Sequence, residues 1–144
     1  MQKLIIDTNV FVSYLISKNG FSYKIIDEMV LGKKALHFVS NETLKENFEV
    51  FGRTRFVKKY PEFSKMVWLL LTNLMELSVL LNPVVAFSTI ENEMDNRFLE
   101  LAHASKADCL ITGNKLHFTF SQFHNTQIVS PREYWENYKP KKDD

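Results

Sequence analysis

The stretch Leu4–Phe11, LIIDTNVF, decides how the rest of the chain is interpreted, because it places an acid inside an apolar run. Three aliphatic residues precede Asp7, and two apolar residues follow Asn9. A short run of this kind is typical of a buried strand. An unpaired carboxylate in such a run is costly. The sequence therefore predicts that Asp7 stands at a strand end, where it can meet other polar groups.

Short apolar runs, beginning with the one before Asp7, recur along the chain and lie between helical stretches. They are KLII at 3–6, ALHFV at 35–39, LSVLL at 77–81, CLIT at 109–112 and TQIV at 126–129. Apolar residues recur at helical spacing in 21–31 and again in 61–75. Strands that alternate with helices favour parallel pairing. We expect an α/β fold, a three-layer α/β/α sandwich around a central, mainly parallel sheet.

Composition indicates an ordinary globular protein of one domain. The chain has 144 residues, of which 45% are hydrophobic, with 18 Lys and Arg against 17 Asp and Glu. We expect one domain over 1–138 and a flexible charged tail over 139–144. The single Cys109 excludes an internal disulfide. The longest apolar stretch, from Val67, is broken by Asn73 and Glu76, so we expect a cytoplasmic protein with no membrane partner.

Two polar residues follow predicted strands and are candidates for a shared site. In open parallel sheets, ligands bind outside the carboxyl ends of the strands. Asp7 and Asn114 both stand at such ends, about 5 Å apart if their strands are neighbours. Asp108 instead opens its strand, about 13 Å away at the opposite edge, so we expect it to be structural, in a pair with a lysine.

A second acid, Asp95, lies near the start of a predicted helix. Phe98, Leu99 and Ala102 follow it at helical spacing and share its face. An Asp at this position is most often a helix cap. Carboxylates that gather without basic partners, however, normally hold a metal ion, and this helix leads directly into CLITGN.

The position of Glu46 cannot be decided from periodicity. The apolar stripe of its helix lies on roughly the opposite side and consists of Leu44, Phe48 and Phe51. Glu42 and Glu49 are equally placed for an acidic role, and a helix surface that carries several acids is usually solvated. Spacing alone predicts that Glu46 is exposed.

Basic and aromatic residues alternate in FGRTRFVKKYPEF, residues 51–63. Such side chains can contact phosphates and stack on bases, so the segment is a candidate for RNA contact, although a solvated basic loop is an equal alternative. The candidates are Arg53, Arg55, Lys58 and Lys59.

His117 could contact substrate or assist proton transfer, whereas a lone histidine is more often structural.

Four motifs together resemble the PIN-domain family, which includes the VapC-type toxins of toxin–antitoxin pairs. They are IIDTNVF at the start, Ser40 with Glu46 six positions later, MDNRFLELAHASKADCLITGN, and IVSPREYW near the end. The resemblance covers nearly the whole chain. It implies a nuclease fold whose acidic cluster binds Mg²⁺ or Mn²⁺ and hydrolyses RNA phosphodiesters. It also implies an antitoxin protein as partner and a homodimer.

Carried over to this sequence, the resemblance assigns catalysis and metal binding to Asp7, Glu46 and Asp95. The supporting polar groups that it implies are Thr8, Asn9, Ser40 and Thr112. Where the family usually has an Asp after the Thr-Gly pair, this chain has Asn114, a neutral ligand with one carbonyl oxygen. One negative charge is therefore missing. We expect a second metal ion to bind more weakly and nuclease activity to be reduced.

Other function classes fit the same residues less well. A phosphohydrolase of the haloacid dehalogenase type needs an Asp two positions after the first one, where this chain has Asn9. A nucleotide-binding protein needs a glycine-rich loop after the first strand, and none follows. A PIN-like module that binds RNA or a protein without cutting stays open. Metal affinity at Asp7 and Asp95 would distinguish it from an enzyme.

Overall fold

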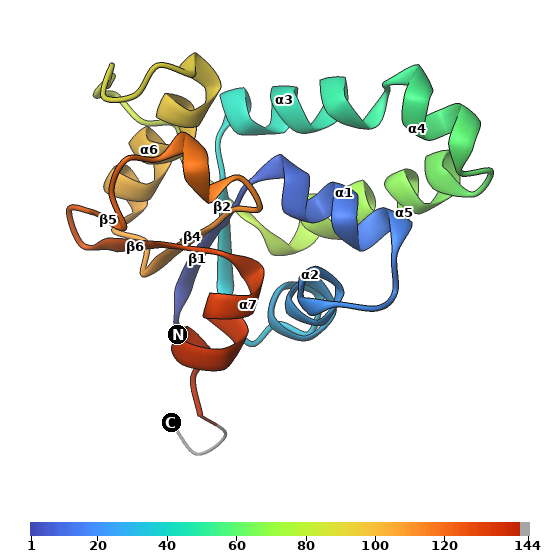
Figure 1. The fold of residues 1–144 in the computed structure, drawn as a ribbon, viewed down its shortest axis with the longest axis horizontal. Coiled ribbons are helices and arrows are strands. Elements are labelled where there is room, and N and C mark those ends of the chain that lie inside the picture. The colour runs from blue at the N-terminus through green and yellow to red at the C-terminus, as the bar shows by residue number, and fades with distance from the viewer. Residues whose placement is uncertain (142–144) are drawn as a thin grey trace.

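A six-stranded sheet forms the centre of the molecule, with its strands in the order β3-β2-β1-β4-β6-β5 (Figure 1). The computed structural model describes residues 1–141. The strands are β1 (Lys3–Ile6), β2 (Leu36–Val39), β3 (Val79–Leu80), β4 (Cys109–Ile111), β5 (Gln122–Phe123) and β6 (Thr126–Val129). The first strand of the sequence therefore lies in the middle of the sheet.

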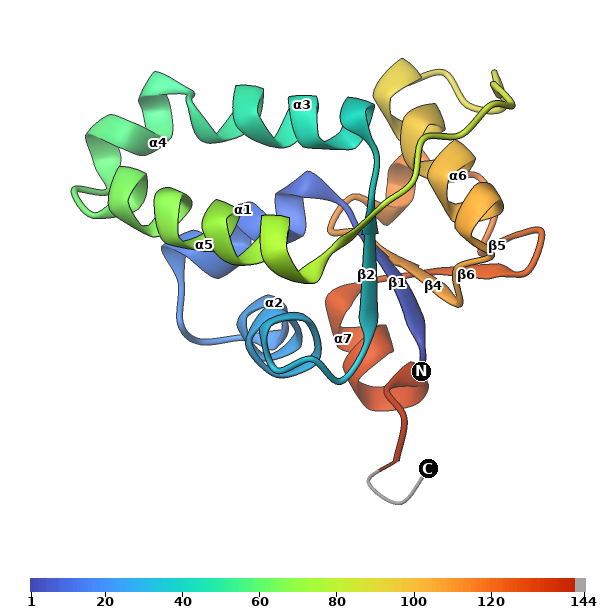
Figure 2. The same cartoon turned by 180° about the vertical axis from the view of Figure 1, so that it is seen from behind.

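Helices connect the strands and surround the sheet. They are α1 (Thr8–Ile16), α2 (Phe21–Lys24), which continues as a π-helix over Ile25–Leu31, α3 (Asn41–Phe51), α4 (Thr54–Lys59), α5 (Phe63–Leu77), α6 (Glu93–Ser105), a 3₁₀ turn at Lys115–His117, and α7 (Pro131–Glu133), which continues as a π-helix over Tyr134–Tyr138. Figure 2 shows α6 on one side of the sheet and α1, α2 and α5 on the other. The predicted α/β/α sandwich is confirmed.

Strand pairing is parallel except at one edge. β1 pairs in parallel with β2 and with β4, and Ile6 of β1 lies opposite Ile111 of β4. β5 and β6 form an antiparallel hairpin, which the sequence analysis did not predict. The hairpin turns at His124, a residue with a positive φ of 52°. The prediction of a mainly parallel sheet is therefore correct, with one antiparallel edge.

The two faces of the sheet pack into separate cores. Leu4 and Ile6 of β1 join one core, with α1 and α5, whereas Ile5 joins the other core, with α6. This alternation follows from the period of two in a strand. A strand that is buried on both faces reads as a continuous apolar run, which explains why KLII carries no polar residue between its first lysine and Asp7.

Some elements differ from the predicted ranges for local reasons. α5 begins at Phe63 and not at Pro61, because the Phe63 N–H donates to the Tyr60 carbonyl in a turn, 3.0 Å. The predicted strand 77–81 is reduced to two residues, because the Ser78 N–H still bonds to Leu74 of α5.

Several smaller predictions also have outcomes. Cys109 is buried. The Asp108 carboxylate accepts from the Lys3 backbone N–H at 2.8 Å, so its partner is a backbone group and not a lysine side chain. Nζ of Lys139, a residue of the predicted tail, lies 3.2 Å from Oε2 of Glu28. The tail residues 142–144 lie outside the described residues. Within residues 1–141, no helix is long and apolar enough to cross a membrane.

Candidate active site

A hollow of about 350 Å³ opens at the carboxyl edge of the central strands. We call it the acid hollow. Nine of the predicted site residues line it: Asp7, Thr8, Asn9, Glu46, Arg53, Arg55, Asp95, Asn114 and His117. Four others do not line it: Ser40, Thr112, Lys58 and Lys59. The structure thus brings together residues that are more than 100 positions apart in the sequence.

Asp7 is held at the centre of the acid hollow by the sheet itself. Its backbone N–H donates to the Ile111 carbonyl at 2.9 Å, which continues the β1–β4 ladder by one bond. Its Oδ2 accepts from the Thr112 hydroxyl at 2.8 Å and from the Asn9 amide at 3.2 Å. The residue is only 6% exposed. Thr112 therefore orients Asp7 from behind, without lining the acid hollow.

Glu46 reaches the acid hollow from α3 and is held there by Thr8. The Thr8 hydroxyl donates to Glu46 Oε2 and accepts from the Asn47 amide at 2.8 Å. Ser40 begins this helix, because its hydroxyl accepts from the Thr43 N–H at 3.1 Å. Ser40 thus contributes by positioning α3, which carries Glu46.

Asp95 enters from the first turn of α6 and is 6% exposed. The cap of this helix is Asn92, whose Oδ1 accepts from the Met94 N–H at 3.1 Å and from the Asp95 N–H at 3.4 Å. The alternative that Asp95 itself is the cap is therefore wrong. Nδ1 of His117 lies 3.2 Å from Asp95 Oδ2.

The loop after β4 lies close to the start of α1. The Gly113 N–H donates to Asn9 Oδ1 at 2.8 Å. A Cβ atom at position 113 would lie 3.1 Å from that oxygen, so a glycine suits this close approach. The Asn114 N–H donates to Thr112 Oγ1 at 3.0 Å, which leaves the exposed Asn114 side chain at the rim of the acid hollow.

The three carboxyl groups share one electrostatic environment. The pKa of Asp7 is raised to about 7, chiefly by burial; the hydrogen bond from Thr112 opposes the rise, and the nearby charges of Asp95 and Glu46 add to it. Burial also raises the pKa of Glu46, with a contribution from Asp95 that Thr8 and Arg53 oppose. Burial raises the pKa of Asp95, and His117 opposes this. Each acid would be stabilised by a cation in the acid hollow.

The donor set fits a hard divalent cation, which prefers carboxylate, carbonyl and water oxygens. Within residues 1–141, no three His, Cys, Asp or Glu side chains are grouped so that they could hold one ion together. An ion here would therefore take one or two carboxylates and complete its shell with water. This is the usual way in which Mg²⁺ binds to proteins.

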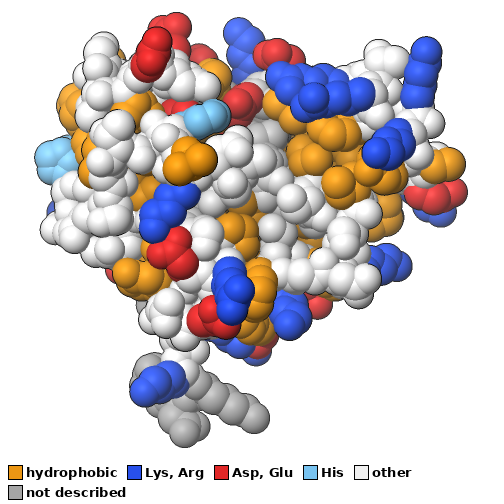
Figure 3. Space-filling model, in the orientation of Figure 1, with side chains coloured by type: hydrophobic (Ala, Val, Ile, Leu, Met, Phe, Trp, Pro, Cys, Tyr) orange, Lys and Arg blue, Asp and Glu red, His pale blue; other side chains and the backbone are white. Residues whose placement is uncertain are grey.

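A basic rim borders the acid hollow on the side of α3 and α4. The Arg55 guanidinium lies over the Phe56 ring, 4.7 Å from its centroid, and Arg53 lies 3.9 Å from Glu49. Figure 3 shows Lys and Arg side chains gathered over this part of the molecule, beside exposed hydrophobic ones. Lys58 and Lys59 end α4, outside the acid hollow.

The sequence analysis missed two functional neighbours, Asn47 and Asn92. Asn47 is buried and donates to Thr8, and Asn92 caps α6 beside Asp95. The signal for Asn92 was present in the sequence, because an Asn just before a helical pattern is a typical N-cap. No periodicity indicated Asn47, because an amide on the inward face of a helix looks the same as a solvated one.

Comparisons with known proteins agree with this architecture. The family model described as "PIN domain" matches residues 3–116. The uncharacterized protein MJ1680 of Methanocaldococcus jannaschii is 31% identical over 147 residues, which cover 95% of this chain and 92% of the relative. A chain in the crystal structure of VapBC2 from Rickettsia felis, bound to a DNA fragment from their promoter, shares the fold. It has a TM-score of 0.57 and 16% identity, over 90% of this chain and 98% of that chain. This chain therefore belongs to the PIN domain family.

Proposed function

We propose that this protein is a metal-dependent endoribonuclease, the toxin of a toxin–antitoxin pair. The observation that carries the proposal is the meeting of Asp7, Glu46 and Asp95, from three separate elements, in one hollow where each has a raised pKa. Membership of the PIN domain family and the shared fold with a VapBC2 chain support a nuclease of toxin–antitoxin type.

In this proposal, Asp7 and Asp95 hold Mg²⁺ or Mn²⁺, with Asn114 offering a carbonyl oxygen at the rim. A bound divalent ion lowers the pKa of a water molecule and offsets charge that develops on the phosphate. Glu46 orients the attacking water, because the Thr8 hydroxyl holds one carboxylate oxygen and leaves the other available. Thr112 and Asn9 keep Asp7 in place.

The RNA is held from the basic rim. Arg53 and Arg55 line the acid hollow and contact phosphates, and Phe56 offers an aromatic face for a base. Lys58 and Lys59 extend the positive charge beyond the acid hollow. His117, beside Asp95, contacts the substrate at the other side. The cognate antitoxin and a homodimer remain part of the proposal, and sedimentation of the chain alone tests the homodimer.

A second candidate function rests on one observation, the neutral Asn114 at the rim. With one acid fewer than the family pattern, the same fold would bind RNA or a protein partner without cutting. The discriminating property is metal affinity, because a binding module has no need of a Mn²⁺ ion between Asp7 and Asp95.

The test is a cleavage assay with single-stranded and structured RNAs in Mn²⁺. Its arms are the wild type, the wild type with a chelator, Asp7→Asn, and the matched control Glu42→Gln, which changes an exposed acid on the same helix as Glu46. Cutting that disappears with the chelator and with Asp7→Asn, but persists in Glu42→Gln, supports the enzyme. Equal background in every arm, from folded protein, favours the binding module.

A further inference from the structure

A second hollow of about 480 Å³ adjoins the acid hollow. We call it the side hollow. Its lining consists of Thr89, Ile90, Glu91, Asn92, Leu116, His117 and Thr119. Asn92 and His117 line both hollows, so the side hollow begins where the acid hollow ends, beside Asp95. A single-stranded RNA bound in the acid hollow can therefore continue directly into the side hollow.

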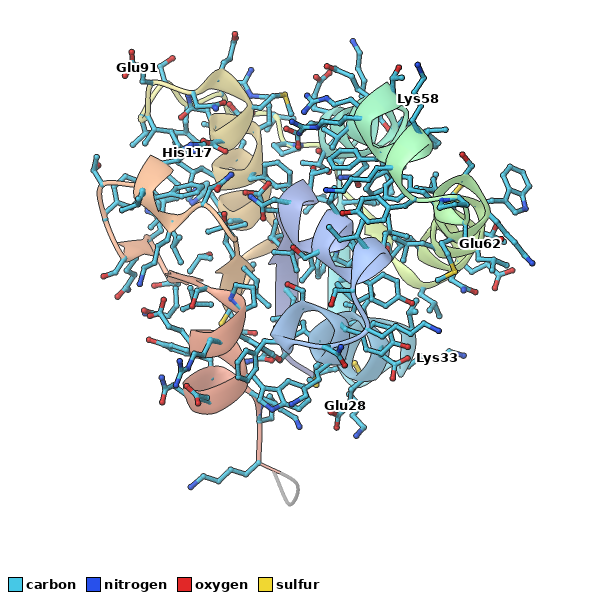
Figure 4. The ribbon with its side chains drawn as sticks, turned by 45° about the vertical axis from the view of Figure 1, so that its right-hand side comes forward. Glu28, Lys33, Lys58, Glu62, Glu91 and His117 are labelled. Atoms are coloured by element: carbon cyan, nitrogen blue, oxygen red, sulfur yellow. The ribbon has the colours of Figure 1, made fainter. Side chains whose placement is uncertain are left out.

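The two ends of this continuous groove differ in charge. The acid hollow is lined by Arg53 and Arg55 as well as by its three acids, whereas the side hollow is lined by one carboxylate, Glu91, and by no Lys or Arg of residues 1–141. Figure 4 shows Glu91 and His117 on one side of the molecule and Lys58 on the other. A phosphate is favoured at the arginine end, and an uncharged group is favoured in the side hollow.

The loop that carries Glu91 is held by hydrogen bonds to α6. Buried Asn96 of α6 accepts from the Ile90 N–H at 3.0 Å, and its amide donates to the Ile90 carbonyl at 2.8 Å. These two bonds anchor the backbone directly before Glu91. The side hollow is thus preorganised, which reduces the entropy that a ligand must overcome on binding.

The polar groups of the side hollow are available to a ligand. The Glu91 carboxylate makes no hydrogen bond or ion pair with any residue in the described range 1–141, and it can only accept hydrogen bonds while ionised. Oδ1 of Asn92 is used to cap α6, so its amide nitrogen remains to donate. Leu116, a residue that is 98% exposed, offers an apolar surface. The combination suits a flat ring that has donors and an acceptor along one edge.

We propose that the side hollow binds a nucleobase, guanine in preference, of a single-stranded RNA whose phosphate lies at the acid hollow. Guanine presents two adjacent N–H donors to a carboxylate such as Glu91, with a carbonyl oxygen beside them for the Asn92 amide. Adenine and cytosine offer one amino group, and uracil offers a single N–H. Unpaired bases are read in this way along their Watson–Crick edges. The inference rests on the proposed function only in taking RNA as the ligand.

The test is equilibrium binding of short RNAs in the presence of a chelator, so that cleavage does not interfere. Eight-nucleotide uridine strands with and without one guanosine are compared for the wild type, Glu91→Ala and the matched control Glu93→Ala, an exposed acid two positions away that lines neither hollow. The wild type should prefer the guanosine strand by roughly 10-fold or more, the range of a good bidentate pair. Glu91→Ala should abolish this preference without weakening uridine binding, and Glu93→Ala should retain it.

A guanosine preference that survives in Glu91→Ala, or that the wild type lacks, overturns the inference. Cleavage by the wild type with no such preference would overturn the inference alone. The preference without cleavage would refute the nuclease and keep the inference. If the folded wild type binds neither strand, the inference fails, and the cleavage assay in Mn²⁺ decides the proposed function separately.

Discussion

Asp7→Asn should make the metal-free protein more stable at pH 8. Burial raises the pKa of Asp7 from 3.8 to about 7, so at pH 8 the folded chain holds an ionised carboxylate in a place that favours the neutral acid. Each tenfold change in proton binding corresponds to about 1.4 kcal/mol, and this rise therefore corresponds to about 4 kcal/mol. Asn loses some of the charge-assisted bond from Thr112, worth about 1 kcal/mol. The expected gain is about 2 to 4 kcal/mol.

The pH dependence of this gain follows from proton linkage. A carboxyl whose pKa is raised on folding binds protons more tightly in the folded state, so wild-type stability should fall as pH rises from about 4 to about 7 and then level off. Asp7→Asn should lack the part of this fall that Asp7 contributes, and should keep the part that comes from the raised pKa values of Glu46 and Asp95. Urea unfolding in a chelator at pH 5 and pH 8 measures both effects, and added Mn²⁺ should stabilise the wild type but not the variant. Equal stability of the two proteins at pH 8 would refute the reasoning about buried charge.

Three further predictions concern other parts of the molecule. Burial lowers the pKa of His37 from 6.5 to about 4, so in a chain with the Asp7→Asn change His37 should contribute a loss of stability of up to about 3 kcal/mol as pH falls from about 6.5 to about 4, and Glu46 and Asp95 should act in the opposite direction. Adding His37→Gln should remove most of that loss in urea titrations, and an unchanged slope would exclude His37 as its source. Gly113→Ala should cost about 1 to 2 kcal/mol in unfolding free energy, because its Cβ would press on Asn9 Oδ1; the same change at exposed Gly52, where a Cβ meets only ordinary contacts, should cost less. Arg55→Ala should weaken RNA binding about equally for all sequences and lower the slope of log affinity against log salt by about 1; a loss confined to one RNA sequence would show that Arg55 reads bases instead.

The sheet and the place of Asp7 could be predicted from the sequence because both depend on local pattern. KLII, CLIT and TQIV are buried apolar runs, and all three became strands of the sheet. A strand end is defined by the first polar residue after such a run, so Asp7 was located to within one position. Ligands of parallel sheets bind at the carboxyl ends of the strands, and this rule predicted that Asp7 and Asn114 lie close together. Both residues line the acid hollow.

Glu46 could not be placed from its spacing, because the apolar stripe of α3 coincides with its buried face only at Phe51. Phe48, which belongs to the apolar stripe and was therefore expected to be buried, is 54% exposed, while Thr43 and Asn47 are buried. The inward face of α3 is polar in its first half, where Asn47 meets Thr8, and only Val50 and Phe51 at its end join the hydrophobic core. Periodicity detects contact with an apolar core, and it gives no signal where a helix packs on a polar site.

The short hairpin at the sheet edge was also missed. β5 has only two residues, and Gln122 and Phe123 carry no alternation that could distinguish a strand from a loop. Its position depends on pairing with β6, and this long-range information is absent from the local sequence.

The middle position of β1 has a consequence for how the protein is made. β1 is paired on both sides, and one of its partners, β4, is synthesised more than a hundred residues after it. The hydrogen bonds of Asp7 to the Ile111 carbonyl and from the Thr112 hydroxyl can therefore form only after β4 has been synthesised. A chain interrupted before β4 lacks these partners, so the acid hollow cannot form until the last quarter of the sequence has been synthesised.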